Sequence, residues 1–222
     1  YYGGWTDEGF IDIDVDPITK NWVAVGSTRG GDYANAFPIS PGAQISLTSY
    51  TNTPNEYMFV LVFKSDGTLV TANTYGLSGY MKPLRAILNG TLVTVVGNCN
   101  IAGQLPLYTS QQAALTAGTY TYATGQGYVM QFEITTAPSS TIQSINTIRW
   151  TTRLNGNASD IDVTPDGKHI YVTSSTHYSL TPMQGMTQTG SYNNGGVTSL
   201  TDINFQVWKF DSLGVRKWSS IL

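Results

Sequence analysis

The sequence predicts an all-β protein built from three consecutive four-stranded antiparallel units. Two observations predict it: the composition and a recurring order of hairpins. Charged residues make up 11% of the 222 residues, whereas the chain has 23 glycines and 14 tyrosines. Exposed amphipathic helices need more Lys, Arg and Glu than this chain has, and abundant glycine indicates many turns.

The first hairpin of a unit is clearest near the two ends of the chain. Residues 11–16 alternate apolar and acidic side chains, and after a turn at Pro17 an apolar run covers residues 22–27. The same pattern returns at residues 160–165 and 170–175. Alternation with period two and a turn at proline are typical of paired strands.

A weaker copy lies between them. Residues 84–88 and 92–97 are apolar runs separated by Asn89-Gly90, and Asn-Gly between such runs is a strong hairpin signal. With Pro17, Leu88 and Pro165 as markers, equivalent positions recur roughly every 70 to 77 residues, and repeats of fixed period indicate stacked units.

Each unit then continues with a second hairpin, which brings it to four strands. These hairpins are predicted at residues 57–64 with 68–75, 128–134 with 147–152 across a long connection at 133–146, and 205–210 with 215–222.

Four-stranded antiparallel units in series predict β-propeller blades, at residues 1–75, 76–153 and 154–222. Propellers typically have 4 to 8 blades, so three blades leave a ring open. We expect the apolar strands 11–15 and 205–210 to be exposed, and the remaining blades to come from the same chain or from another copy. The first and last residues are expected to be the ends of a segment cut from a longer repeat array.

A long connection separates the second and third strands of every unit, at residues 28–56, 99–127 and 176–204. Strands of a meander alternate in direction, so all three connections are expected at one end of the blades. Loops of this length on a rigid scaffold are usually functional. Their aromatic residues are candidates for protein contacts, for stacking on sugars or for pinning the loops onto the blades: Tyr33, Phe37, Tyr50, Tyr108, Tyr120, Tyr122, Tyr178 and Tyr192.

Three stretches resemble the bacterial-type seven-bladed (SBBP-like) β-propeller repeat family. They are the hairpin at residues 161–173, the Phe-Pro-Ile-Ser-Pro-Gly-Ala-Gln loop at 37–44 and the return hairpin at 205–214. The second unit departs from this pattern at Leu105-Pro106-Leu107, and the third keeps only Tyr178 and Pro182 of the loop. The resemblance implies architecture in large surface or extracellular proteins; the family's motif residues are structural, so it implies no catalytic residue.

Asp12, Asp14 and Asp16 have the spacing of the first half of an EF-hand loop. Pro17 stands where that loop needs glycine, and Val23 stands where it needs a bidentate glutamate. The run is therefore interpreted as a strand with acidic residues on its polar side.

Catalytic and metal-binding patterns are weak elsewhere. His169 and His177 are the two histidines, without a nearby Cys pair or carboxylate at helical spacing, and no nucleophile motif is present. Paired carboxylates for glycoside chemistry are conceivable among Asp160, Asp162, Asp202 and Glu56, with turn or capping roles as the default. No catalytic residue, cofactor or metal is predicted.

The remaining signals bear on partners and environment. The net charge of −3, without a basic stripe, argues against nucleic acid, and the apolar run 57–63 is too short to span a membrane. Cys99, the single cysteine, is expected to be a buried thiol at a strand end. Asn89 and Asn157 begin sequons in predicted turns and are candidate N-glycosylation sites; Asn89 is also explained by its tight turn.

The sequence therefore predicts a non-enzymatic structural or adhesive propeller module of a large extracellular or cell-surface protein, with a surface filament or appendage as one form of assembly. Its long loops would contact protein partners. The alternative is a carbohydrate-binding or carbohydrate-active propeller that uses loop tyrosines and acidic residues, with glycans as ligands.

Overall fold

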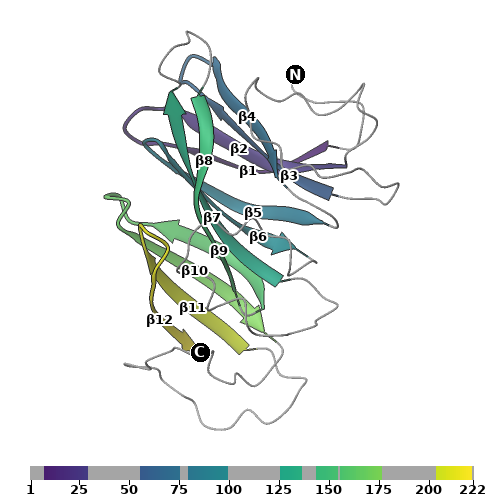
Figure 1. Ribbon diagram of the computed structural model, residues 1–222, viewed down its shortest axis with the longest axis vertical. Coiled ribbons are helices and arrows are strands. Elements are labelled where there is room, and N and C mark those ends of the chain that lie inside the picture. The colour runs from purple at the N-terminus through teal and green to yellow at the C-terminus, as the bar shows by residue number, and fades with distance from the viewer. Residues whose placement is uncertain are drawn as a thin grey trace.

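A computed structural model describes the strands and short turns of the chain. The described residues are 8–29, 56–75, 80–99, 126–136, 144–154, 156–176 and 204–221. They form three four-stranded antiparallel sheets that resemble propeller blades and are called blade 1, blade 2 and blade 3 in chain order. The sheets follow one another along the long axis of the molecule (Figure 1).

Each blade is a simple meander, in which strands adjacent in sequence are adjacent in the sheet. Blade 1 contains β1 (Glu8–Val15), β2 (Trp22–Arg29), β3 (Glu56–Phe63) and β4 (Leu69–Tyr75). Blade 2 contains β5 (Met81–Asn89), β6 (Leu92–Cys99), β7 (Gln126–Thr136) and β8 (Ser144–Arg153). Blade 3 contains β9 (Asn157–Val163), β10 (His169–Thr176), β11 (Asn204–Asp211) and β12 (Arg216–Ile221).

The predicted fold class, all-β with three four-stranded antiparallel units, is confirmed. Each sheet lies inside one of the three ranges assigned to a blade from the sequence. One connection was overestimated: the β7–β8 ladder extends to the pair Thr136 and Ser144, so both ends of the stretch 133–146 are strand. β-Branched residues are favoured in strands, whereas the many polar residues of this stretch made it resemble a loop in the sequence.

A β-bulge recurs at the same place in the first strand of every blade. The register shifts at Ile11 in β1, at Leu84 in β5 and at Ser159 in β9. A bulge inserts one unpaired residue and re-aims the side chains that follow it. Its recurrence sets the equivalence of positions among the three blades.

Counting from the bulge corrects one marker of the repeat. Leu88 is equivalent to Val15, whereas Pro17 and Pro165 are equivalent to Gly90. The turn after β5 is shorter than the turn after β1, so a comparison of the apolar flanks alone shifts the match by two residues.

Two apolar clusters fill the spaces between successive blades. The first joins blade 1 to blade 2 and includes Met58, Val60, Leu88 and Tyr128, all nearly inaccessible to solvent. The second joins blade 2 to blade 3, and its largest fully buried side chains are Trp150 and Trp208. The two interfaces therefore bury separate cores, as expected of stacked repeats.

A glycine faces a large ring in two of the blades. Gly26 pairs with Phe59 and Gly97 pairs with Tyr128, and a Cβ on Gly97 would lie 2.7 Å from Cζ of Tyr128. Blade 3 has Ser174 opposite Gln206 instead. Because Gln206 has no ring to lie against β10, a side chain fits at position 174. The Ser174 hydroxyl accepts a hydrogen bond from Nε1 of Trp208 at 2.8 Å.

Several further expectations concern exposure. Cys99 is buried at the end of β6, as predicted. Phe10, Ile13, Val15 and Phe205 are all more than half exposed, which confirms the expectation for the first strand of blade 1. For residues 205–210 it holds only in part, because Trp208 and Phe210 are buried against blade 2. Among the described residues, no helix is long and apolar enough to cross a membrane.

Candidate functional site

The first strands of the blades, β1, β5 and β9, lie next to one another and carry most of the polar contacts between blades. The bulge register makes Asp12, Arg85 and Asp160 equivalent. Two residues later stand Asp14, Ile87 and Asp162, and two residues after those stand Asp16, Asn89 and Thr164. Alternate residues of a strand point to one side, so the three residues that each strand contributes form a row along that strand.

Blade 1 is fastened to blade 2 by its row of aspartates. Asp12 Oδ2 accepts the N–H of Ala86 at 3.0 Å, and Asp14 Oδ2 accepts the N–H of Leu88 at 2.8 Å. Asp16 Oδ2 accepts the N–H of Gly90 at 2.9 Å. Because the donors are also two residues apart, three carboxylates of one strand match three main-chain groups of the next.

This matching supplies acceptors to N–H groups of an edge strand that no neighbouring strand accepts. Since β5 is the first strand of blade 2, every second N–H of β5 points away from β6. A buried N–H without an acceptor costs roughly 1 to 3 kcal/mol. The aspartates supply the acceptors while the side chains of Ala86 and Leu88 stay buried against blade 1.

Asp16 is the most enclosed carboxylate of this row, with 2% of its surface exposed. Burial on its own would raise the pKa of Asp16. Hydrogen bonds donated by the Ile18 N–H, the Thr19 hydroxyl and the Gly90 N–H outweigh it and hold that pKa below its ordinary value. Asp16 therefore stays ionised at neutral pH while it closes its own turn and caps the neighbouring one.

The interface between blades 2 and 3 meets the same need differently. Arg85 and Ile87 stand where an acceptor is required, and neither side chain can accept a hydrogen bond. The N–H groups of Ile161 and Val163 are instead accepted by Oδ1 of the residue that precedes each, Asp160 and Asp162, both at 2.9 Å.

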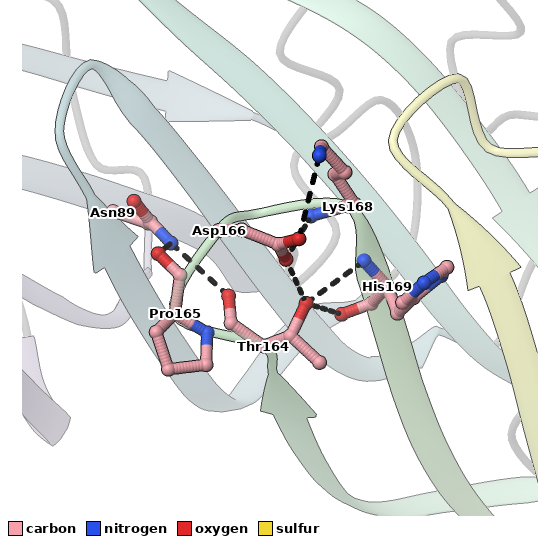
Figure 2. A network of polar contacts seen from close by, with 6 residues as sticks. All are labelled: Asn89, Thr164, Pro165, Asp166, Lys168 and His169. Atoms are coloured by element: carbon pink, nitrogen blue, oxygen red, sulfur yellow. Dashed lines mark hydrogen bonds and ion pairs between the residues drawn. The ribbon is translucent and has the colours of Figure 1, made fainter.

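At the third position of the row, donor and acceptor exchange roles. Pro165, the equivalent of Gly90, has no N–H to offer. Asn89, the equivalent of Asp16, donates through Nδ2 to the carbonyl oxygens of Thr164 and Pro165 at 3.3 and 3.2 Å (Figure 2). The contact between neighbouring turns thus persists with reversed polarity.

The blade 3 turn that receives Asn89 is held by its own side chains. The Thr164 hydroxyl donates to Asp166 at 2.6 Å and accepts the His169 N–H at 3.0 Å (Figure 2). Bonds from the Thr164 hydroxyl and the Lys168 N–H hold the pKa of Asp166 below its ordinary value. The turn therefore has hydrogen bonds of its own that do not depend on Asn89.

Arg85 connects all three blades. Its Nη1 lies 3.2 Å from Asp12 Oδ1 and its Nε lies 3.4 Å from Asp160 Oδ1. More than half of the Arg85 side chain is exposed, so these ion pairs are partly screened by water. They position the first strands more than they stabilise the fold.

Aromatic residues complete the interfaces. At blade 1–blade 2 the Tyr128 hydroxyl donates to Met58 Sδ at 3.2 Å, and full burial raises the pKa of Tyr128 well above its ordinary value. At blade 2–blade 3 Trp150 lies against Gly214, and its Nε1 lies 3.1 Å from Gln131 Oε1 and 3.3 Å from the Ser212 carbonyl oxygen. A polar contact adds to this second interface, because Oδ1 of Asn98 accepts the N–H of Ala158 at 2.8 Å.

The structure places the candidate residues from the sequence unevenly. Tyr33, Phe37, Tyr50, Tyr108, Tyr120, Tyr122, Tyr178 and Tyr192 lie outside the described residues, as do His177 and Asp202. Asn157 lies at the start of β9, opposite Ser175, and Asn89 uses the same amide nitrogen that a glycan would occupy. Use of either sequon stays a prediction.

The candidate carboxylates are also placed. Asp160 and Asp162 lie on β9, whereas Glu56 lies at the start of β3 opposite Arg29, so they belong to different blades. The described residues contain no group of three His, Cys, Asp or Glu side chains arranged to hold a metal ion.

The fastening role of the aspartate row was not foreseen from the sequence. The alternating Asp residues were assigned to a polar strand face, and the N–H groups that donate to them belong to a segment about 74 residues further along the chain. The sequence did contain a signal: residues 11–16 alternate apolar and acidic side chains, whereas the equivalent strand of the next repeat is mostly apolar.

No protein-family model matches the chain, and no curated protein matches it. Among solved structures, a variant of the Synechocystis apocarotenoid oxygenase is similar over 97% of this chain, with 10% sequence identity and a TM-score of 0.36. The chain spans 38% of that structure. A likeness this distant carries no argument about activity, and the description of the blades rests on strand order and register.

Proposed function

We propose that the chain is a non-enzymatic structural β-propeller module, of the SBBP-like repeat type, in a large extracellular or cell-surface protein. Its blades form a stiff platform, and the connections between second and third strands contact protein partners. The observation that carries the proposal is the use of the acidic row: Asp12, Asp14 and Asp16 all accept main-chain N–H groups of the next blade.

The polar groups of the first strands support a mechanical role. A carboxylate that accepts strand N–H groups is held in one orientation, which suits a scaffold better than proton transfer. Asp160 and Asp162 likewise accept N–H groups of their own strand. Rigid repeats that hold long connections at one end are typical of interaction platforms.

The surface location is supported by composition and by the sequons. Few charges and connections rich in Ser, Thr and Asn suit an extracellular module. Of the two candidate acceptors, Asn157 is the better one, because a glycan on Asn89 would replace a hydrogen that Nδ2 donates to blade 3. Packing of the loop ends against neighbouring copies would extend such modules into a filament or layer.

Surface digestion of intact cells tests the proposal. Peptides of this chain should be released by protease added to intact cells of the source organism, and the peptide containing Asn157 should carry a glycan mass. A known cytoplasmic protein is the control and should be released only after lysis. Release of this chain's peptides only after lysis, with unmodified Asn157, would overturn the proposal.

The carbohydrate-binding alternative has one supporting observation in the described residues. The rings of Tyr171 and Trp218 lie 6.2 Å apart on blade 3, and 39% of Trp218 is exposed. Exposed aromatic rings can stack on sugars. A glycan array probed with the wild-type chain and with Trp218→Ala tests this alternative; binding that depends on Trp218 supports it, and an empty array removes it.

A further inference from the structure

The first strand of blade 1 lacks the neighbour that the equivalent strand of blade 2 has among the described residues. Ile13 pairs with Ala24 as Ala86 pairs with Val95, so the N–H of Ile13 points away from β2. Val15 pairs with Trp22 as Leu88 pairs with Val93, so the N–H of Val15 also points away from β2. β1 therefore presents two N–H groups, two residues apart, along an open edge.

The side chains at these positions indicate that the edge is half of an interface. Ile13 is 61% exposed and Val15 is 51% exposed. Their equivalents in blade 2, Ala86 and Leu88, are 2% and 1% exposed because blade 1 covers them. A preceding blade would cover Ile13 and Val15 in the same way.

Blade 3 presents the other half. Asp160 and Asp162 are equivalent to Asp12 and Asp14, and both are exposed. The hydrogen bonds and ion pairs within the described residues use only their Oδ1 atoms. Phe205 is 59% exposed, whereas its equivalent Met58 is fully buried against blade 2.

The two halves agree in number as well as in chemistry. At the blade 1–blade 2 interface three acceptors meet three N–H groups. On blade 3 the third position is Thr164, whose hydroxyl is already engaged within its turn. On blade 1 the third position is Pro17, which has no N–H. Two acceptors thus meet two donors at the same spacing, with an apolar flank on each side.

We propose that blade 3 of one copy of this chain binds blade 1 of a second copy, with Asp160 and Asp162 accepting the N–H groups of Ile13 and Val15 of that second copy. Two such contacts close a ring of six blades, within the 4 to 8 typical of propellers. This proposal rests on the proposed function, because it treats the sheets as structural propeller blades.

Sedimentation velocity of the purified chain over a range of concentrations tests it. The wild-type chain should form a dimer of twice 24.1 kDa. The double variant Asp160→Ala/Asp162→Ala should raise the dissociation constant at least tenfold. Asp66→Ala, which removes a carboxylate from an exposed turn of blade 1, is the matched control and should leave the dimer unchanged.

A second variant tests the donor side. Val15→Pro removes one outward N–H, and proline is tolerated on an edge strand where the N–H faces solvent. It should weaken the dimer while circular dichroism of the monomer stays that of the wild type. A wild-type chain that remains monomeric at about 100 μM, a dimer insensitive to both variants, or open chains longer than a dimer would each overturn the closed pair.

These outcomes are distinguishable from failure of the proposed function. A folded monomer released from cell surfaces would remove only the docking between copies. A dimer with the expected sensitivity, in a protein that protease reaches only after lysis, would remove only the surface role.

Discussion

Both interfaces between blades provide acceptors for the outward N–H groups of a first strand, but different residues supply them. At blade 1–blade 2 the outward N–H groups of β5 are accepted by aspartates of the neighbouring blade. At blade 2–blade 3 the equivalent groups of β9 are accepted by aspartates of β9 itself. Repeats can therefore diverge in sequence as long as each edge donor keeps an acceptor, from whichever strand supplies it.

The two interfaces also differ in the kind of contact that crosses between the blades. In the first, charged hydrogen bonds cross between the strands, and Asp16 alone connects two turns. In the second, the connections that cross include Asn89 to the blade 3 turn, Asn98 to Ala158 and the Trp150 ring against Gly214, and the ion pair of Arg85 with Asp160 is largely exposed. We expect blade 2–blade 3 to depend most on packing and blade 1–blade 2 to depend more on charge.

The largest effect is expected for Trp150→Ala. Trp150 is 1% exposed and fills the space between β8 and the blade 3 turn, so its removal leaves a cavity and takes one hydrogen bond from Gln131 Oε1. The loss of unfolding free energy should be about 3 to 5 kcal/mol, measured by urea denaturation. The exposed Trp218→Ala is the matched control and should cost about 0.5 kcal/mol or less. Equal costs would contradict the packing account of this interface.

A smaller effect is expected for Asp14→Ala, which removes the acceptor of the Leu88 N–H across the first interface. The expected loss is roughly 1.5 to 3 kcal/mol, as for other hydrogen bonds to charged groups. Asp162→Ala, at the equivalent position of blade 3, should cost clearly less, since exposed Val163 N–H can bond water instead. Both are compared at the lowest usable protein concentration, where association of copies contributes least. The comparison fails if Asp162→Ala is the more damaging change.

The charge of Asp16 predicts a pH dependence. Its pKa is lowered in the folded state, so its stabilisation is present above the ordinary value of 3.8 and is lost as the pH falls below that value, through the folded pKa. Asp16→Asn should be less stable than the wild type at pH 7, and the difference should shrink in acid. Urea midpoints across that range measure it; a constant difference would show that the carboxylate charge is irrelevant.

The smallest effect is expected for Arg85→Gln. Its two ion pairs are partly exposed, so their loss should cost under about 1 kcal/mol despite the contact with three blades. Thermal unfolding with and without added salt measures it, and the wild-type advantage should decrease with salt. A salt-independent loss of several kcal/mol would mean that Arg85 has a packing role.

Much of the fold could be predicted from the sequence because each blade is built from local signals. The Asn89-Gly90 turn, the turn at Asp66-Gly67 and the alternation of residues 11–16 each specify a hairpin independently of the rest. The three blades follow once those hairpins are ordered. The equivalence of Leu88 was misassigned, because bulges cannot be located from side-chain pattern alone, and the length of the connection at 133–146 was overestimated.

The contacts between blades could not be predicted in the same way. That Asp14 accepts the N–H of Leu88 depends on how two sheets stack, which the sequence of neither strand specifies. The exchange of Asp16–Gly90 for Asn89–Pro165 becomes meaningful only when the turns are known to touch. Equally, the role proposed for the loop tyrosines depends on residues outside the described segments.

Amide hydrogen exchange of the Leu88 N–H, followed by NMR, tests the central claim that aspartates of one blade cap the edge strand of the next. In the wild type this outward amide should be strongly protected, and Asp14→Ala should speed its exchange at least tenfold while the inward amides of β5 stay protected. The Val163 amide should be unaffected by that variant, because Asp162 of its own strand accepts it. Unchanged exchange at Leu88 in Asp14→Ala would contradict the account.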